Sequence, residues 1–107
     1  MNVFADVPPG QVVEVEYLIK FVRNADCRME RNGEFYSGEE VTAHILSKYD
    51  YYREEISSTE EFIELSASKS VISGKSYVAH CNDSEPVNSG VWLLKELRSY
   101  RESVKLK

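Results

Sequence analysis

The sequence predicts an α+β fold, a single small domain in which helices pack a short three-stranded antiparallel sheet. Three observations predict it. Several stretches repeat apolar residues at helical spacing, Asn32-Gly33 marks a hairpin between two strand-like segments, and a third segment alternates up to Cys81. Because three short strands are not stable alone, helices have to cover them. The expected order of elements is α-β-β-α-α-β-α.

Composition limits the classes of function. The chain has 107 residues, 42% of them hydrophobic, which is enough to bury one core without a metal or dense cross-linking. Its net charge of -5, from 18 acidic and 13 basic residues, argues against nucleic acid as a partner, because phosphate binding needs clustered cations. No apolar run approaches the length of about 18 residues that a membrane span needs.

The beginning of the chain carries a signal about compartment. Residues 1–10 are interpreted as a flexible leader and residues 11–107 as the globular domain. Val3 and Ala5 have the spacing of positions minus three and minus one of a signal-peptidase site. We therefore expect the leader to be the remnant of a signal-peptide cleavage in an exported, periplasmic protein. The alternative is a disordered leader of a cytosolic protein.

Two helices are expected in the first half of the chain. The first spans Gln11–Ala25, and its apolar stripe consists of Val12, Val15, Leu18, Ile19 and Val22. Ser37 and Glu40 form a capping box, in which each side chain accepts a hydrogen bond from the other residue's amide, and this predicts the start of the second helix. Its apolar face consists of Val41, Ile45, Tyr49, Tyr52 and Ile56.

The segment Cys27–Tyr36 between these helices is typical of a short hairpin. Asn32-Gly33 is a strong signal for it, since both central positions of a type I′ turn need positive φ. We expect the inward residues of the two strands to be Cys27, Met29 and Phe35.

The second half of the chain predicts a helix, a strand and a last helix. Ser58 and Glu61 form another capping box, and Gly74 supplies the residue that ends the helix. The small residues 66–68 and 70 leave room for another backbone to approach closely. The strand spans Ser76–Cys81. The last helix begins at Gly90, after a loop over residues 82–89, and its apolar stripe consists of Leu93, Leu97, Tyr100 and Val104.

The two cysteines predict a disulfide. In an antiparallel pair the start of one strand lies opposite the end of its neighbour, so Cys27 and Cys81 would face each other at one rim of the sheet. Directly opposed residues meet the distance that a disulfide needs. The alternative is two buried, reduced thiols in a cytosolic protein.

Several stretches together resemble a known family. They are Met29–Tyr36 (MERNGEFY), Ser37–His44, Thr59–Ser70 (TEEFIELSASKS) and Ser73–Tyr77 (SGKSY). In this order they resemble a small family of exported bacterial proteins of unknown function, the YfeK-like group. The resemblance implies secretion to the periplasm. It implies no established activity and no catalytic residues.

One motif offers an enzymatic alternative. Ser66-x-x-Lys69 matches the spacing at which a lysine takes the proton of a serine nucleophile, as in some serine hydrolases. The further motifs of such enzymes are absent from the sequence. His44, His80 and the cysteines lack the spacing of a zinc site, so we expect no metal and no cofactor.

The aromatic residues favour binding over catalysis. Our main hypothesis is a non-enzymatic binding or interaction module, in which Phe35, Tyr36, Tyr51 and neighbouring acids recognise a protein or a cell-envelope glycan. The alternative for these three side chains is packing at the core and its edge. The alternative function is a small serine hydrolase that uses Ser66 and Lys69.

Overall fold

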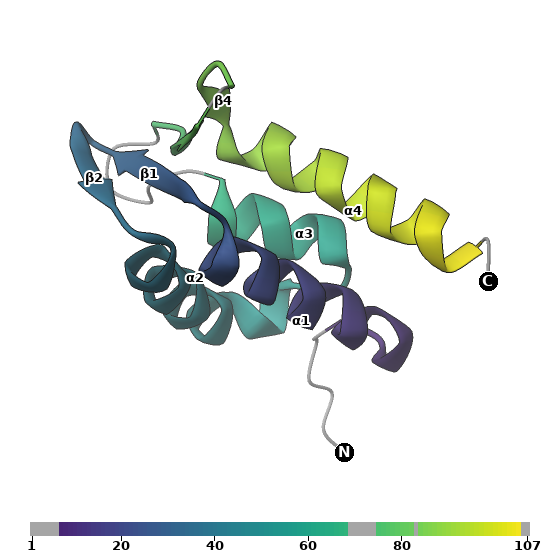
Figure 1. The fold of residues 1–107 in the computed structure, drawn as a ribbon. Coiled ribbons are helices and arrows are strands. Elements are labelled where there is room, and N and C mark those ends of the chain that lie inside the picture. Colours follow the sequence, from purple (N-terminus) through teal and green to yellow (C-terminus); the bar gives the residue numbers. More distant parts are fainter. Residues whose placement is uncertain (1–6, 69–74, 83, 106–107) are drawn as a thin grey trace.

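A computed structural model describes residues 7–68, 75–82 and 84–105, and Figure 1 shows how the elements are arranged. The sheet lies at one end of the molecule, and α1, α2, α3 and α4 extend away from it. In chain order the elements are α1 (Pro9–Asn24), β1 (Cys27–Arg31), β2 (Glu34–Tyr36), α2 (Gly38–Tyr52), the 3-10 turn η1 (Arg53–Glu55), α3 (Thr59–Phe62), the π-helical segment η2 (Ile63–Ala67), β3 (Val78–Cys81), β4 (Val87–Asn88) and α4 (Ser89–Lys105).

The sheet has four antiparallel strands in the order β2-β1-β3-β4, so the predicted three-stranded sheet is wrong by one strand. The missing strand is β4, which pairs with Val78 and Ala79 of β3. The sequence does not reveal β4 because its two residues are too few to show alternation, and they follow Pro86 in an expected loop. The observed order of helices and strands is α-β-β-α-α-β-β-α.

The strand register gives the sheet two different faces. Opposed residues of an antiparallel pair point to the same side, and neighbours along a strand alternate. Met29 pairs with both Tyr36 and Ala79, and Met29 and Ala79 are buried in the core. Glu30 pairs with Phe35, which lies on the outer face with 47% of its surface exposed. The prediction that Phe35 faces inward is therefore wrong, because the two-residue turn fixes a register that places Tyr36 there.

The predicted disulfide is present at the rim of the sheet. Cys27 and Cys81 are directly opposed in the β1–β3 ladder, and their alpha carbons lie 4.1 Å apart. The bond joins positions separated by 54 residues along the chain. The segment between them, which includes β2, α2 and α3, is therefore closed into a covalent loop, and α1 and α4 lie outside it.

The third helix begins at the predicted residue and changes geometry after one turn. The Ser58 hydroxyl accepts a hydrogen bond from the Glu61 amide at 3.1 Å. The Glu61 carboxylate accepts from the amide and the hydroxyl of Ser57, so the capping arrangement is shifted by one residue from the predicted box. The chain then continues from α3 into η2. The predicted helix end at Gly74 lies outside the described residues.

The start of α4 packs closely against the small residues around η2. Ser89 is buried and donates a hydrogen bond to the Ala67 carbonyl at 2.6 Å. A Cβ on Gly90 would lie 2.9 Å from the Cβ of Ser68, closer than side-chain carbons pack. The backbones of η2 and α4 therefore approach as closely as the run of small residues predicts.

Helices α1 and α4 pack in opposite directions along much of their length. Tyr17 of α1 stacks on Tyr100 with ring centroids 4.3 Å apart, whereas Phe21, one turn later in α1, contacts Trp92, two turns earlier in α4. Residues later in α1 therefore contact residues earlier in α4. This antiparallel contact brings the start of α1 beside the end of α4.

An ionic cluster, called the Arg101 network here, joins α1, α3 and α4 at the end opposite the sheet. Arg101 donates to both oxygens of Glu14 at 2.8 Å and, through Nη1, to Glu60 at 2.7 Å. Thr59 donates its hydroxyl to Glu14 at 2.7 Å and its amide to Gln11 at 2.8 Å. Arg101 lowers the pKa of both carboxyls below the ordinary value, chiefly through these hydrogen bonds.

One hydrophobic core fills the space between the sheet and the helices. Its buried side chains are Val7, Val15, Leu18, Val22, Met29, Val41, Ile45, Ile56, Phe62, Ile63, Ala67, Tyr77, Ala79, Leu93 and Leu97. Val7 precedes α1 and yet packs in this core. Among the described residues, no helix is long and apolar enough to cross a membrane.

Candidate functional site

The outer face of the sheet carries four side chains that contact one another, called the outer-face cluster here. They are Arg28 and Glu30 of β1, Phe35 of β2 and His80 of β3. The Arg28 guanidinium lies over the Phe35 ring, 4.8 Å from its centroid, and the His80 ring meets Phe35 edge-on at 5.1 Å. His80 Nε2 lies 2.9 Å from a carboxylate oxygen of Glu30. Phe35 therefore lies across β1 and is held from two sides.

The hairpin turn determines which side chains form this cluster. Asn32 and Gly33 have φ of 52° and 85°, the positive values of a tight two-residue hairpin turn. The resulting register sets Phe35 opposite Glu30, while the disulfide-linked β3 sets His80 opposite Arg28. A shift of one residue in any one of these strands would turn its members of the cluster toward the core and separate them from the others. The turn and the β1–β3 pairing thus build the cluster together.

The cluster presents a cation and an aromatic ring to solvent. Arg28 is exposed, and within the described residues its guanidinium contacts the Phe35 ring but no carboxylate. Glu30 instead neighbours His80. Arginine and aromatic side chains are enriched at protein interfaces, where a stacked guanidinium keeps its donors available. The arrangement is therefore suited to an acidic and partly apolar ligand.

The other two predicted binding residues lie elsewhere. Tyr36 is half-buried on the inner face of the sheet, where its ring meets His44 edge-on at 5.1 Å. Tyr51 is 79% exposed and contacts Tyr52 near the end of α2. Tyr51 follows Gly38 by 13 positions in α2, which corresponds to a rise of roughly 20 Å. Because Gly38 closely follows Phe35 in the chain, Tyr51 is far from Phe35. The three aromatics do not form one surface.

The proposed serine nucleophile is not accessible. Ser66 is 0% exposed, and among the described residues its hydroxyl has no hydrogen-bond partner. Lys69, the second residue of that motif, lies outside the described residues. A substrate could reach the Ser66 hydroxyl only after η2 moved away from the core. The geometry therefore gives the hydrolase alternative no support.

A second polar group lies on the inner side of the sheet, beneath β1 and β2. Burial lowers the pKa of His44, and the nearby charges of Arg31 and Lys48 lower it further. Lys48 donates a hydrogen bond to the Tyr77 hydroxyl at 2.5 Å. Among the described residues no group of three or more histidine, cysteine or acidic side chains is placed to hold a metal. We assign these residues to packing between α2 and the sheet.

The sequence reasoning missed three members of the outer-face cluster, namely Arg28, Glu30 and His80. A signal for them exists, because residues that alternate with Met29 and Ala79 must share the opposite face once β1 and β3 are paired. The contact between Phe35 and His80 had no such signal. It depends on a side-chain conformation that reaches across a whole strand.

Comparison with known proteins adds one finding. A family described as a "Family of unknown function (DUF5329)" matches residues 9–101 of the chain. The match includes the whole outer-face cluster and most of α4. No curated protein and no solved structure matches. The chemistry of the site therefore has to be argued from its own side chains.

Proposed function

We propose that this chain, which belongs to the DUF5329 family of unknown function, is a non-enzymatic interaction module that binds a partner protein through the outer-face cluster. The observation that carries the proposal is Phe35, a large apolar ring left 47% exposed between Arg28 and His80. Phe35 is exposed beside Arg28, whose guanidinium contacts no carboxylate among the described residues. Arginine and aromatic side chains are enriched at the centres of protein interfaces.

The neighbouring strand edge supports a protein as the partner. β2 is the terminal strand of the sheet, so its outer backbone groups have no neighbouring strand within the described residues. An extended peptide that paired there would lie beside Phe35 and Arg28. A carboxylate on that peptide would meet the Arg28 guanidinium with the fork geometry that arginine favours. We therefore propose an acidic, partly apolar peptide segment as the recognised element.

The disulfide supports export. Such bonds persist in oxidising compartments, and Cys27–Cys81 joins the strands that carry three of the four cluster residues. We propose on this ground that the protein acts in the periplasm. The relation to the YfeK-like group remains a prediction from the motifs.

The test is affinity capture with matched surface variants. Purified wild-type protein, Arg28→Glu, Phe35→Ser and Tyr51→Ala would be compared as baits for periplasmic extract, with circular dichroism to verify folding. We expect a captured protein whose affinity falls about thirtyfold in the first two variants, since interface centres contribute at least about 2 kcal/mol. Tyr51→Ala is the control, because it removes a more exposed aromatic far from the cluster. Equal capture by all four baits would contradict the proposal.

A further inference from the structure

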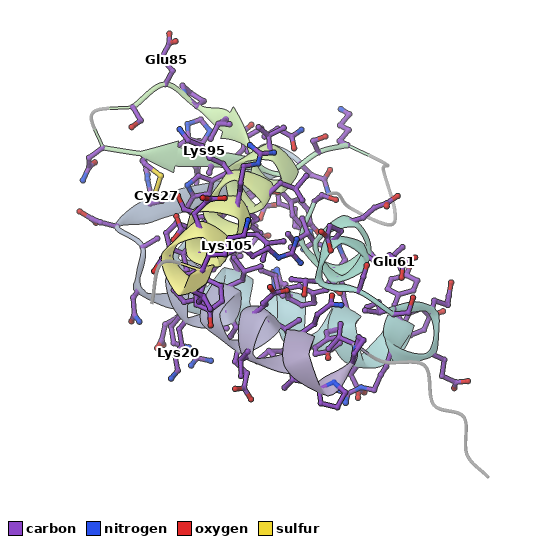
Figure 2. All side chains as sticks on the ribbon, turned by 90° about the vertical axis from the view of Figure 1, so that its right-hand side faces the viewer. Lys20, Cys27, Glu61, Glu85, Lys95 and Lys105 are labelled. Atoms are coloured by element: carbon purple, nitrogen blue, oxygen red, sulfur yellow. A yellow bond between two sulfur atoms is a disulfide. The ribbon has the colours of Figure 1, made fainter. Side chains whose placement is uncertain are left out.

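A hollow beside α4, separate from the outer-face cluster, has the features of a small-ligand site. Its volume is about 380 Å³, and it lies between the β3–β4 connection and the first half of α4. Figure 2 labels Glu85, Lys95 and Cys27 in this region, with the disulfide beside them. We call it the Trp92 hollow. It shares no residue with the outer-face cluster, so an inference about it does not rest on the proposed function.

Part of the lining of the Trp92 hollow is apolar. Val87 and Val91 line it together with Trp92 and the disulfide-bonded Cys81. Trp92 is half-buried, and its ring packs against Phe21 at 4.9 Å, which holds the indole in one orientation. An indole supported in this way offers a flat, rigid surface for a ligand at a low entropic cost.

The rim of the hollow contains an oriented carboxylate. Glu96 lines it one helical turn after Trp92, and its Oε2 accepts a hydrogen bond from the Tyr17 hydroxyl. This bond raises the pKa of Tyr17 to about 12, so the phenol keeps its proton and remains a donor. The other oxygen, Oε1, accepts no hydrogen bond from the described residues. A fixed acceptor therefore lies next to the indole.

The rest of the rim can both donate and accept. Lys95 follows Trp92 on the same side of α4, and Glu85 lies on the β3–β4 connection with its side chain directed away from α4. Ser84 and Ser99 add hydroxyl groups. The Glu96 carboxylate and the nearby negative charge of Glu85, against one ammonium, disfavour an anionic ligand. A ligand that suits this rim is uncharged, has one apolar face, and carries several groups that donate and accept hydrogen bonds at once.

We propose that the Trp92 hollow binds one pyranose ring of a neutral saccharide. The C–H face of the ring would lie on the indole of Trp92, and its hydroxyls would donate to Glu96 and accept from Lys95. Hydroxyl groups are the common ligand groups that play both roles. The volume lies near the lower limit of small-molecule sites, which suits a single ring of a longer chain.

Tryptophan fluorescence reports directly on this site, because Trp92 is the only tryptophan of the chain. Intrinsic fluorescence would be titrated with three neutral trisaccharides, namely cellotriose, maltotriose and N,N′,N″-triacetylchitotriose, and with the anionic trisaccharide trigalacturonate. We expect a saturable change with at least one neutral saccharide at concentrations up to about 50 mM, and none with trigalacturonate. No saturable change with any neutral saccharide would overturn the proposal, as would binding of trigalacturonate alone.

Variants assign any signal to the hollow. Glu96→Gln keeps the shape and an acceptor for Tyr17, but replaces a charged acceptor by a neutral one, and we expect its affinity to fall about tenfold. Tyr51→Ala, which removes an exposed side chain outside both sites, is the control and should bind like wild type. Unchanged affinity in Glu96→Gln would refute the proposed contacts. A signal produced only by a tyrosine-containing peptide, and not by saccharides, would identify the hollow as a peptide site and refute the saccharide.

Discussion

The two ends of the molecule are held together by different chemistry. At the sheet end, a covalent bond between Cys27 and Cys81 joins β1 to β3. At the helical end, Arg101 joins α1, α3 and α4 through hydrogen-bonded ion pairs with Glu14 and Glu60. In Figure 1 the sheet lies near the start of α4, and the end of α4 lies on the opposite side of the molecule. Each end connects segments that are distant in sequence, and neither relies on packing alone.

The difference predicts which conditions each end tolerates. A disulfide is indifferent to salt and moderate acid but depends on the redox state of its surroundings. An ionic cluster is indifferent to reductant but weakens when salt screens it or acid protonates it. The covalent end is also the one that carries the outer-face cluster and borders the Trp92 hollow. The proposed binding surfaces therefore lie at the end whose strands are joined by a link that does not depend on salt.

The largest expected effect comes from breaking the covalent end. The double variant Cys27→Ala, Cys81→Ala should lose about 4 kcal/mol of unfolding free energy, because the bond closes a loop of 54 positions in the unfolded chain. Urea denaturation would measure the loss, and wild type in dithiothreitol should show the same midpoint. The loss should hardly change between low and high salt. A loss below about 1 kcal/mol would contradict the entropic argument.

Breaking the ionic end should have a smaller, salt-dependent effect. Glu14→Gln removes the carboxylate that receives two of the Arg101 hydrogen bonds, and Glu14 is only 13% exposed. We expect a loss of about 2 kcal/mol at low salt, because Arg101 keeps only its partly exposed partner Glu60. Glu16→Gln, on the exposed side of the same helix, is the control and should change stability by less than about 0.5 kcal/mol. If both variants behaved alike, the network would contribute nothing specific.

Acid should affect the two ends at different pH values. The pKa of His44 is lowered by burial, so the unfolded state binds more protons, and stability falls as pH drops through the unfolded value near 6.5. The pKa values of Glu14 and Glu60 are also lowered, so their contribution is lost as pH drops below their ordinary value of 4.5. Melting temperatures between pH 8 and pH 3 would show two declines.

Two variants separate these declines. His44→Gln should flatten the curve between about pH 7 and pH 5 and leave the lower decline in place. Glu14→Gln should do the reverse. A single decline that neither substitution altered would show that other groups control the acid response.

The sequence predicts much of this fold because its signals are local. The Asn32-Gly33 turn, the Ser37–Glu40 capping box and the paired cysteines each follow from a few neighbouring residues, and the structure contains all three. The strand β4 is missed because two residues are too few to show the alternation of buried and exposed side chains that is typical of a strand. The inward position of Tyr36 is missed because register depends on the turn geometry and not on hydrophobicity alone.

The candidate site is less predictable than the fold. Phe35 was singled out as an aromatic residue, but Arg28 and His80 join it only after three strands have paired. Tyr36 and Tyr51 are predicted on the same ground, as aromatic residues. They lie apart, Tyr36 against His44 and Tyr51 against Tyr52. The Trp92 hollow combines α4 with a connection that follows the third strand, so its lining has no contiguous motif. Sites assembled from several elements require the tertiary structure.

The covalent loop also determines how the chain would respond to mechanical force. A pull applied near Pro9 and Lys105 would travel along α1, cross the sulfur–sulfur bond and leave along α4. The chain between the two cysteines, which are 54 positions apart, would carry no tension. A contour length of roughly 190 Å would therefore not extend under force. Only the outer helices would unravel, while β2, α2 and α3 stayed shielded inside the ring. Stretched between two anchors, the protein would extend only through the residues outside this loop and then stop.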